Sequence, residues 1–287
     1  MEEHIFNIDG LTHQFADGTF ALKDLSLTIQ QGKKIALLGN NGAGKSTLFQ
    51  HLNGLLKPTT GSIKFKGKKL KYDRKTLLLL RKQVGIVFQD PDSQLFSANV
   101  QQDISFGPMN LGWERDVVRE KVEWAMAQTE VTELKDKPTH FLSLGQKKRV
   151  AIAGVLAMEP EVWILDEPTA GLDSYFSKQI MALLDNIHLP DKTIILSTHD
   201  VNLAYQWADE IIVMNDGKVI YQGDPVTIFH HEDLLYQAHL EKPWIFEMFQ
   251  SLIQSKIFTE DDSAPRTKEE LLQKMEIERL IKKQSLA

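Results

Sequence analysis

One loop organises this chain, and it reads Gly39-Asn40-Asn41-Gly42-Ala43-Gly44-Lys45-Ser46-Thr47. The apolar run at residues 33–38 is typical of a strand at the centre of a parallel sheet, and a helical pattern starts at Leu48. A strand, a loop of spacing G-x-x-x-x-G-K-S and a helix form the context of a phosphate-binding loop, whose backbone N–H groups turn toward an anion. In such a loop Lys45 reaches the β- and γ-phosphates, and Ser46 is placed to bind Mg²⁺. The sequence therefore predicts a nucleoside triphosphate site.

Two carboxylates follow a second buried strand, predicted over residues 162–165. Asp166 and Glu167 stand at its C-terminal end, which is where ligands bind in open α/β sheets. Asp166 fits the Mg²⁺-associated carboxylate of phosphate-loop enzymes, and Glu167 is placed to polarise an attacking water. The alternative is a solvated pair that only caps the strand. The presence of the phosphate loop in the same chain favours the functional interpretation.

Two ring side chains also lie where a nucleotide would bind. The strand predicted at residues 193–197 ends close to His199, on the side of the sheet that the phosphates occupy. A lone histidine after a strand is usually structural, but this placement favours a functional role. Phe15 lies in the turn region between strands predicted at residues 4–9 and 20–29. It is either a core aromatic or a ring on which an adenine base stacks.

The remaining pattern predicts further strands and a change to helices. Leu25, Leu27 and Ile29 alternate with polar residues, as in a half-buried antiparallel strand. The other expected elements are an edge strand at 62–67, a helix at 72–82, a strand at 84–88, helices at 116–128 and 147–158, a hairpin of 211–214 with 218–221 and a final amphipathic helix at 268–283; residues 261–265 read as a loop.

Composition narrows the class of protein. The chain has 287 residues, 42% of them hydrophobic and 25% charged, as in an ordinary globular protein. No apolar stretch approaches the length of a membrane span, and the acidic start of the sequence does not resemble a signal peptide. Cysteine is absent, which excludes disulfides and thiolate metal sites. The net charge of −6 gives no broad electrostatic footprint for nucleic acid, so we expect no nucleic-acid partner.

In this order, the motifs resemble those of the ATP-binding cassette (ABC) ATPase family over roughly residues 4–225. The glycine-rich loop is similar to its Walker A motif, and residues 162–167 are similar to its Walker B motif with the catalytic glutamate. The other matches are Gln89 to the Q-loop glutamine, Ser143, Gly145 and Gln146 to the signature motif, Asp173 to the D-loop, His199 to the switch histidine and Phe15 to the adenine-stacking aromatic. Leu144 departs from the pattern, because the signature motif normally has a glycine there.

The resemblance implies a fold and a set of roles. It implies an α/β protein with a P-loop NTPase (RecA-like) core and an antiparallel β subdomain within residues 1–228, an inserted helical subdomain at about residues 92–160 and a C-terminal helical extension at residues 229–287. It implies ATP and Mg²⁺ as cofactors. Catalytic roles fall on Glu167, His199 and Gln89, and Mg²⁺ is expected on Ser46, Gln89 and Asp166. The Walker A loop, Phe15, the signature residues and Asp173 would contact the nucleotide.

Residues 88–96, 103–112 and 146–154 are similar to the energy-coupling-factor and cobalt/nickel-importer branch of the family. This branch implies a second ABC ATPase subunit, identical or different, together with a transmembrane coupling subunit and a substrate-binding membrane subunit. The chain would then lie on the cytoplasmic face of the cell membrane and drive uptake of cobalt or nickel. His230 and His231 are adjacent, so they cannot share one face of a helix, and a solvated surface is favoured over a metal site.

Other functions remain open at this point. One is the shared ATPase of a vitamin-type importer of the same branch. Another is a soluble ABC ATPase acting on DNA or ribosomes; about fifty residues separate Gln89 from Ser143, too few for the coiled-coil arm of the DNA-acting relatives. A phosphate-loop kinase or GTPase would lack the signature motif and His199.

Overall fold

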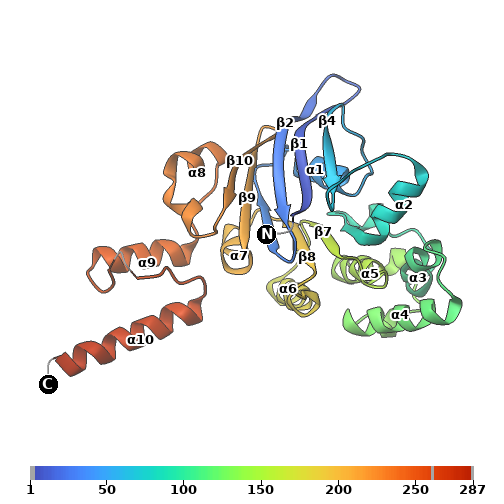
Figure 1. The fold of residues 1–287 in the computed structure, drawn as a ribbon. Coiled ribbons are helices and arrows are strands. Elements are labelled where there is room, and N and C mark those ends of the chain that lie inside the picture. Colours follow the sequence, from blue (N-terminus) through green and yellow to red (C-terminus); the bar gives the residue numbers. More distant parts are fainter. Residues whose placement is uncertain (1–3, 260–261, 286–287) are drawn as a thin grey trace.

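Two β-sheets with helices on both sides build the fold (Figure 1). The structure is a computed structural model that describes residues 4–259 and 262–285. Its larger sheet is mixed and has the strand order β10-β9-β3-β8-β7-β6, in which only β10 runs antiparallel to its neighbour. These strands are β3 (Lys34–Leu38), β6 (Val84–Val87), β7 (Val162–Asp166), β8 (Thr193–Ser197), β9 (Glu210–Asn215) and β10 (Lys218–Gly223).

The predicted central position of the strand before the phosphate loop is confirmed, since β3 lies between β9 and β8. Its side chains alternate between two cores. Ala36 and Leu38 pack into one hydrophobic cluster, and Ile35 and Leu37 into the other. A strand that is buried on both faces needs an unbroken apolar run, which is why β3 contains no polar residue after Lys34. The carboxyl ends of the parallel strands β3, β6, β7 and β8 therefore meet at one edge of a sheet whose central strands are buried.

The smaller sheet is antiparallel and has the order β2-β1-β4-β5. The predicted burial of Leu25, Leu27 and Ile29 on one face of its second strand is confirmed. The prediction of an edge strand at 62–67 was wrong, because β4 pairs on one side with β1 and on the other with the short β5. The strands are β1 (His4–Gln14), β2 (Phe20–Gln30), β4 (Thr60–Phe65) and β5 (Lys68–Lys69).

Helices α3, α4 and α5 contact one another, and α5 contacts the edge strand β6 of the large sheet; Figure 1 shows the three helices grouped together. The helix predicted at 147–158 begins earlier, because Ser143 and Gln146 form a capping box that starts α5 at Leu144. The helix predicted at 72–82 begins later, because Asp73 caps it through the N–H of Thr76. The helices up to this point in the chain are α1 (Lys45–Leu52), α2 (Arg74–Gln83), α3 (Val100–Asn110), α4 (Arg115–Gln128), α5 (Leu144–Leu156), α6 (Ser174–Ile187) and α7 (Val201–Trp207).

The predicted hairpin is confirmed, with Asp216 and Gly217 both at positive φ in a two-residue turn between β9 and β10. After it, the chain folds back onto α7. The Tyr205 hydroxyl donates to the Pro265 carbonyl at 3.1 Å, and the Arg266 guanidinium donates to the carbonyls of Tyr205 and Ala208. The last elements are a 3₁₀ turn, η4 (Thr227–His230), and helices α8 (Glu232–Ala238), α9 (Trp244–Gln254) and α10 (Lys268–Ser285).

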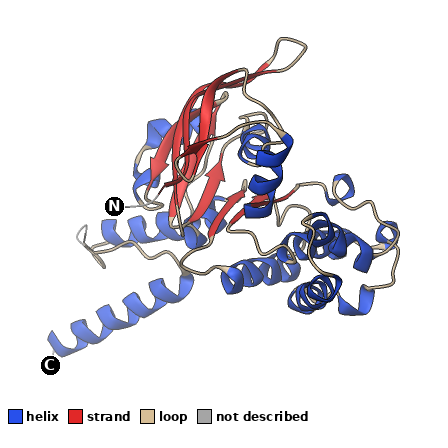
Figure 2. Ribbon diagram, turned by 45° about the vertical axis from the view of Figure 1, so that its right-hand side comes forward, coloured by secondary structure: helices blue, strands red, loops and turns tan. Residues whose placement is uncertain are grey.

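Figures 1 and 2 show α8–α10 on the opposite side of the sheets from α3–α5. Phe246 and Phe249 of α9 are buried against the body of the protein. Of the predicted loop at 261–265, residues 262–265 are outside regular structure and residue 261 lies outside the described residues. Within the described residues, no helix combines the length and apolar character that a membrane span requires.

Candidate nucleotide site

A pocket of about 390 Å³ opens at the carboxyl ends of the parallel strands. It brings together residues predicted from five separate parts of the sequence. The pocket is lined by Phe15, Thr19, Phe20, Ala21, Asn40, Asn41, Gly42, Ala43, Gly44, Lys45, Ser46, Thr47, Gln89, Asp166, Glu167 and His199. Phe15 is 44% exposed at the rim, so it is not a core aromatic. The sheet thus gathers the glycine-rich loop, both carboxylates and the histidine around one space.

Two glycines let the loop pack closely against neighbouring backbone of the same chain. Gly39 has φ +146°, and a Cβ there would lie 2.3 Å from the Met214 carbonyl oxygen; Gly44 has φ +100° and would place a Cβ 2.5 Å from the Ala21 oxygen. Lys45 Nζ donates to the carbonyls of Gly39 at 2.5 Å and Asn40 at 3.2 Å, so the loop wraps around its own ammonium group. Burial lowers the pKa of Lys45, while the negative charges of Glu167 and Asp166 oppose that shift.

The two carboxylates are buried and held by Ser197 at the end of β8. The Ser197 hydroxyl donates to Asp166 Oδ1 at 2.6 Å and accepts the backbone N–H of Glu167 at 2.9 Å. His199 Nε2 lies 2.8 Å from Glu167 Oε1. Burial raises the pKa of Glu167, while His199 and Lys45 oppose the rise. Sequence reasoning missed Ser197; the only signal was its place at the end of the strand that leads to His199.

Five predicted nucleotide-contacting residues do not line this pocket: Gly39, at the start of the loop, and four residues from other parts of the chain. Ser143 and Gln146 cap α5, with Ser143 N donating to Gln146 Oε1 at 3.0 Å. Asp173 caps α6 by accepting the Phe176 N–H at 2.9 Å. A Cβ on Gly145 would lie 3.6 Å from Leu172, so the signature loop and the D-loop are neighbours within the chain. These four residues form a second surface, which a single copy does not bring to its own phosphate loop.

The donor atoms at the pocket suit Mg²⁺. Ser46, Gln89 and Asp166 offer a hydroxyl, an amide oxygen and a carboxylate, and Mg²⁺ prefers a few such oxygen ligands completed by phosphate and water. Within the described residues, no group of three or more His, Cys, Asp or Glu side chains is placed to hold a metal without a substrate. His230 and His231 are exposed, as predicted, and belong to no such group.

A family model matches about half of this chain, and individual relatives match most of it. The family model described as ABC transporter matches residues 22–170. The energy-coupling factor transporter ATP-binding protein EcfA3 of Clostridium perfringens is 47% identical over 263 residues, covering 91% of this chain and 92% of that protein. EcfA of Methanosphaera stadtmanae is 45% identical over 263 residues, covering 92% and 95%.

Two solved structures extend the likeness to the fold. CbiO1 of Clostridium perfringens, described as part of the ABC transporter complex CbiONQ, has 48% identity and a TM-score of 0.72, covering 87% of this chain and all of that one. The ATP-binding cassette MJ0796, solved as a dimer with ADP and Pi in a post-hydrolysis state, has 28% identity and a TM-score of 0.71, covering 77% and 98%. The predicted fold class is therefore confirmed. The chain belongs to the ABC transporter ATPases, and within them to the energy-coupling factor transporter ATP-binding proteins.

Proposed function

We propose that this chain powers an energy-coupling-factor importer for cobalt or nickel, using ATP held between two cassettes. The likeness to CbiO1, described as part of the CbiONQ complex, favours these metal ions. They would be cargo that passes through membrane subunits, and this chain would supply the energy from the cytoplasmic face of the membrane. We take residues 1–228 as the cassette, with a helical subdomain at about residues 92–160, and residues 229–287 as a helical extension.

The observation that carries the chemical part of this proposal is the contact of Glu167 with His199 at the mouth of the phosphate loop. Lys45 and the loop N–H groups would bind the phosphates, and Phe15 would stack on adenine. Glu167 would orient the attacking water, and His199 would donate to the transferring phosphoryl group. Mg²⁺, held by Ser46, Asp166 and Gln89, would neutralise charge on the phosphate oxygens.

The site becomes complete only with a second cassette. Ser143 lies at the N-terminus of α5, where free N–H groups favour an anion, and it lies outside the pocket of its own chain. We propose that Ser143, Gly145, Gln146 and Asp173 meet the nucleotide of a neighbouring cassette arranged head to tail. The dimeric post-hydrolysis structure of the MJ0796 cassette supports a dimer as the working unit.

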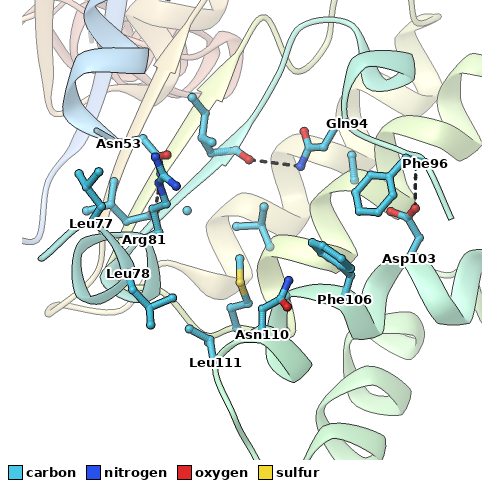
Figure 3. A pocket seen from close by; sticks show the side chains of 18 of the residues that line it. Asn53, Leu77, Leu78, Arg81, Gln94, Phe96, Asp103, Phe106, Asn110 and Leu111 are labelled. Carbon is cyan, nitrogen blue, oxygen red and sulfur yellow. Dashed lines mark hydrogen bonds between the residues drawn. The ribbon is translucent and has the colours of Figure 1, made fainter. Parts of the chain in front are cut away.

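A large groove is the proposed seat of the membrane coupling subunit. It has a volume of about 840 Å³ and is lined by α2, α3, α5 and the segment after Gln89 (Figure 3). Phe96 is 65% exposed in its wall, and its ring meets that of Phe106 edge to face. Apolar side chains that are left open in a groove between helices suit an amphipathic helix as occupant.

A short segment of chain links the groove to the nucleotide pocket. The Gln94 amide donates to the Ile86 carbonyl at 3.3 Å, as Figure 3 shows, and its oxygen accepts the N–H of Phe88 at 3.0 Å. Ile86 lies in β6, and Phe88 follows that strand directly before Gln89, which lines the pocket. A helix seated in the groove would therefore press on a segment that reaches the phosphates. This link would pass closure of the dimer to the membrane subunit.

The Glu167→Gln variant tests the catalytic arrangement. It should retain ATP binding and accumulate an ATP-bound dimer, because the phosphate contacts remain while water is no longer activated. Size-exclusion chromatography with ATP and Mg²⁺ measures the dimer, and phosphate release measures turnover. Turnover near that of the parent protein would reject the role of Glu167.

The transported solute is tested in the assembled complex. The chain should co-purify with multispan membrane subunits, and cells or vesicles that contain the complex should take up cobalt or nickel only when ATP is hydrolysed. ATP-dependent uptake of a vitamin in place of either metal would contradict the proposed cargo while leaving the ATPase assignment intact. Absence of any membrane partner would contradict the transport role.

A further inference from the structure

Lys148 is a buried charge that the proposed mechanism leaves unused. It lies in α5, five residues after Ser143, and is only 3% exposed. A lysine is rarely buried this completely unless its ammonium group is paired, because removing the charge from water is costly. Here burial lowers the pKa of Lys148, while the charges of Glu167 and Asp166 oppose that shift. A methionine could be buried here without the cost of removing a charge from water. The contacts of the ammonium group must therefore account for a lysine at this position.

The ammonium group of Lys148 holds the turn that follows β7. Its Nζ donates to the carbonyl of Glu167 at 2.9 Å and to that of Ala170 at 2.7 Å. The same Glu167 carbonyl accepts the Ala170 N–H at 3.1 Å, which closes the turn. Lys148 thus uses two of its three donors on two carbonyls of one loop, three residues apart.

The residue at the start of this turn needs such support. Glu167 has φ +50°, a left-handed conformation that is uncommon for a residue with a side chain. Its N–H is fixed by the Ser197 hydroxyl and its carbonyl by Lys148. The backbone of Glu167 is therefore clamped on both sides, and this sets the direction in which its carboxylate leaves the chain toward His199.

We propose that Lys148 is a positioning residue for ATP hydrolysis: by binding the carbonyls of Glu167 and Ala170, it holds the carboxylate of Glu167 against the attacking water. This inference rests on the proposed role of Glu167. It also gives the signature helix a physical connection to the catalytic carboxylate of the same chain, because Ser143 and Lys148 lie on one rigid helix. A displacement of the helix start by a neighbouring cassette would move the clamp.

The test uses Lys148→Met, which keeps an unbranched side chain one atom shorter and removes its donors, in the full-length protein. We expect kcat for ATP hydrolysis to fall about 10- to 100-fold, in the range of a lost positioning contact, while the Kd of a fluorescent ATP analogue stays within about twofold. Lys147→Met is the matched control. Lys147 is the preceding residue, and its ammonium group pairs with Asp92 at 2.6 Å, away from the turn, so kcat should be unchanged.

A double variant separates positioning from general stability. Because Lys148 acts through Glu167, adding Lys148→Met to Glu167→Gln should lower the residual kcat less than about twofold. A second loss as large as the first would overturn the proposal, as would loss of nucleotide binding in Lys148→Met. If Glu167→Gln is slow but Lys148→Met turns over at the parental rate, only the clamp is wrong. If Glu167→Gln itself is fast, the proposed function fails.

Discussion

The buried His51 predicts how much stability this protein loses when the pH is lowered. It lies in α1, the helix that begins with Lys45, and its side chain is 0% exposed. Its ring meets that of His13 at 4.8 Å between centroids, and His13 in turn meets Phe15 at 4.9 Å. Burial, and after it the charge of His13, lowers the pKa of His51 to about 4 from its ordinary 6.5. The folded protein therefore keeps His51 neutral at a pH where the unfolded chain binds a proton.

The size of this loss of stability follows from the difference between the pKa of His51 in the folded protein and its pKa in the unfolded chain. A histidine whose pKa is depressed by folding contributes its full stability above pH 6.5 and loses it as the pH falls toward 4. Lowering the pH from about 7.5 to about 5 should cost about 2 kcal/mol of unfolding free energy through His51 alone. In His51→Phe, which keeps a ring without a titratable group, the decrease over the same interval should be smaller by that amount.

The assay is urea unfolding of the nucleotide-free protein at both pH values, followed by tryptophan fluorescence. The exposed His231 offers a control, since His231→Gln should lose as much stability on acidification as the parent. If His51→Phe becomes as acid-labile as the parent protein, the buried imidazole is not the source of the effect.

Two further changes test the site directly. Lys45→Ala should weaken binding of a fluorescent ATP analogue at least about 100-fold, because the loop loses its phosphate countercharge, whereas the exposed Lys57→Ala should bind normally; normal binding by Lys45→Ala would contradict its role. Ser197→Ala removes the hydroxyl shared by Asp166 and the Glu167 N–H and should lower kcat at least about tenfold, since the Asp166 carboxylate and the Glu167 backbone each lose a hydrogen bond. Ser255→Ala is its control, because that hydroxyl bonds only within α9 at Ser251, and an unchanged kcat in Ser197→Ala would mean that the hydroxyl does not position the carboxylates.

The elements that local chemistry dictates could be predicted from the sequence. The strand before the phosphate loop needs an apolar run because both of its faces are buried, and the hairpin after β9 needs the positive φ of Asp216 and Gly217. The pocket could also be predicted, because residues that follow parallel strands meet at one edge of the sheet. The family resemblance added Gln89, for which local pattern alone gives little reason, and decided between the two interpretations of Phe15.

What depends on contacts between distant residues could not be predicted. The earlier start of α5 is a different case, because the capping box of Ser143 with Gln146 is a local S-x-x-Q pattern that the predicted boundary overlooked. The spacing of apolar residues in α9 did not say where they pack; the ring of Phe246 meets those of Tyr205 and Phe229, and the ring of Phe249 meets that of Phe258. Ser197 and Lys148 act through hydrogen bonds across about thirty and twenty residues of chain, which no local window contains.

Leu144 is a single residue whose contacts could not be predicted from the sequence. The resemblance marks it as a departure from the signature glycine, and the sequence leaves open whether the leucine crowds the nucleotide or turns away. The structure places its Cδ2 so close to Gly171 that a Cβ on that glycine would lie only 3.0 Å from it. Leu144 therefore leans on the D-loop of its own chain, and Gly171 accommodates it because it has no side chain. The leucine fills space between two motifs of one chain and leaves the Ser143 cap intact, so the departure is compatible with a working signature surface.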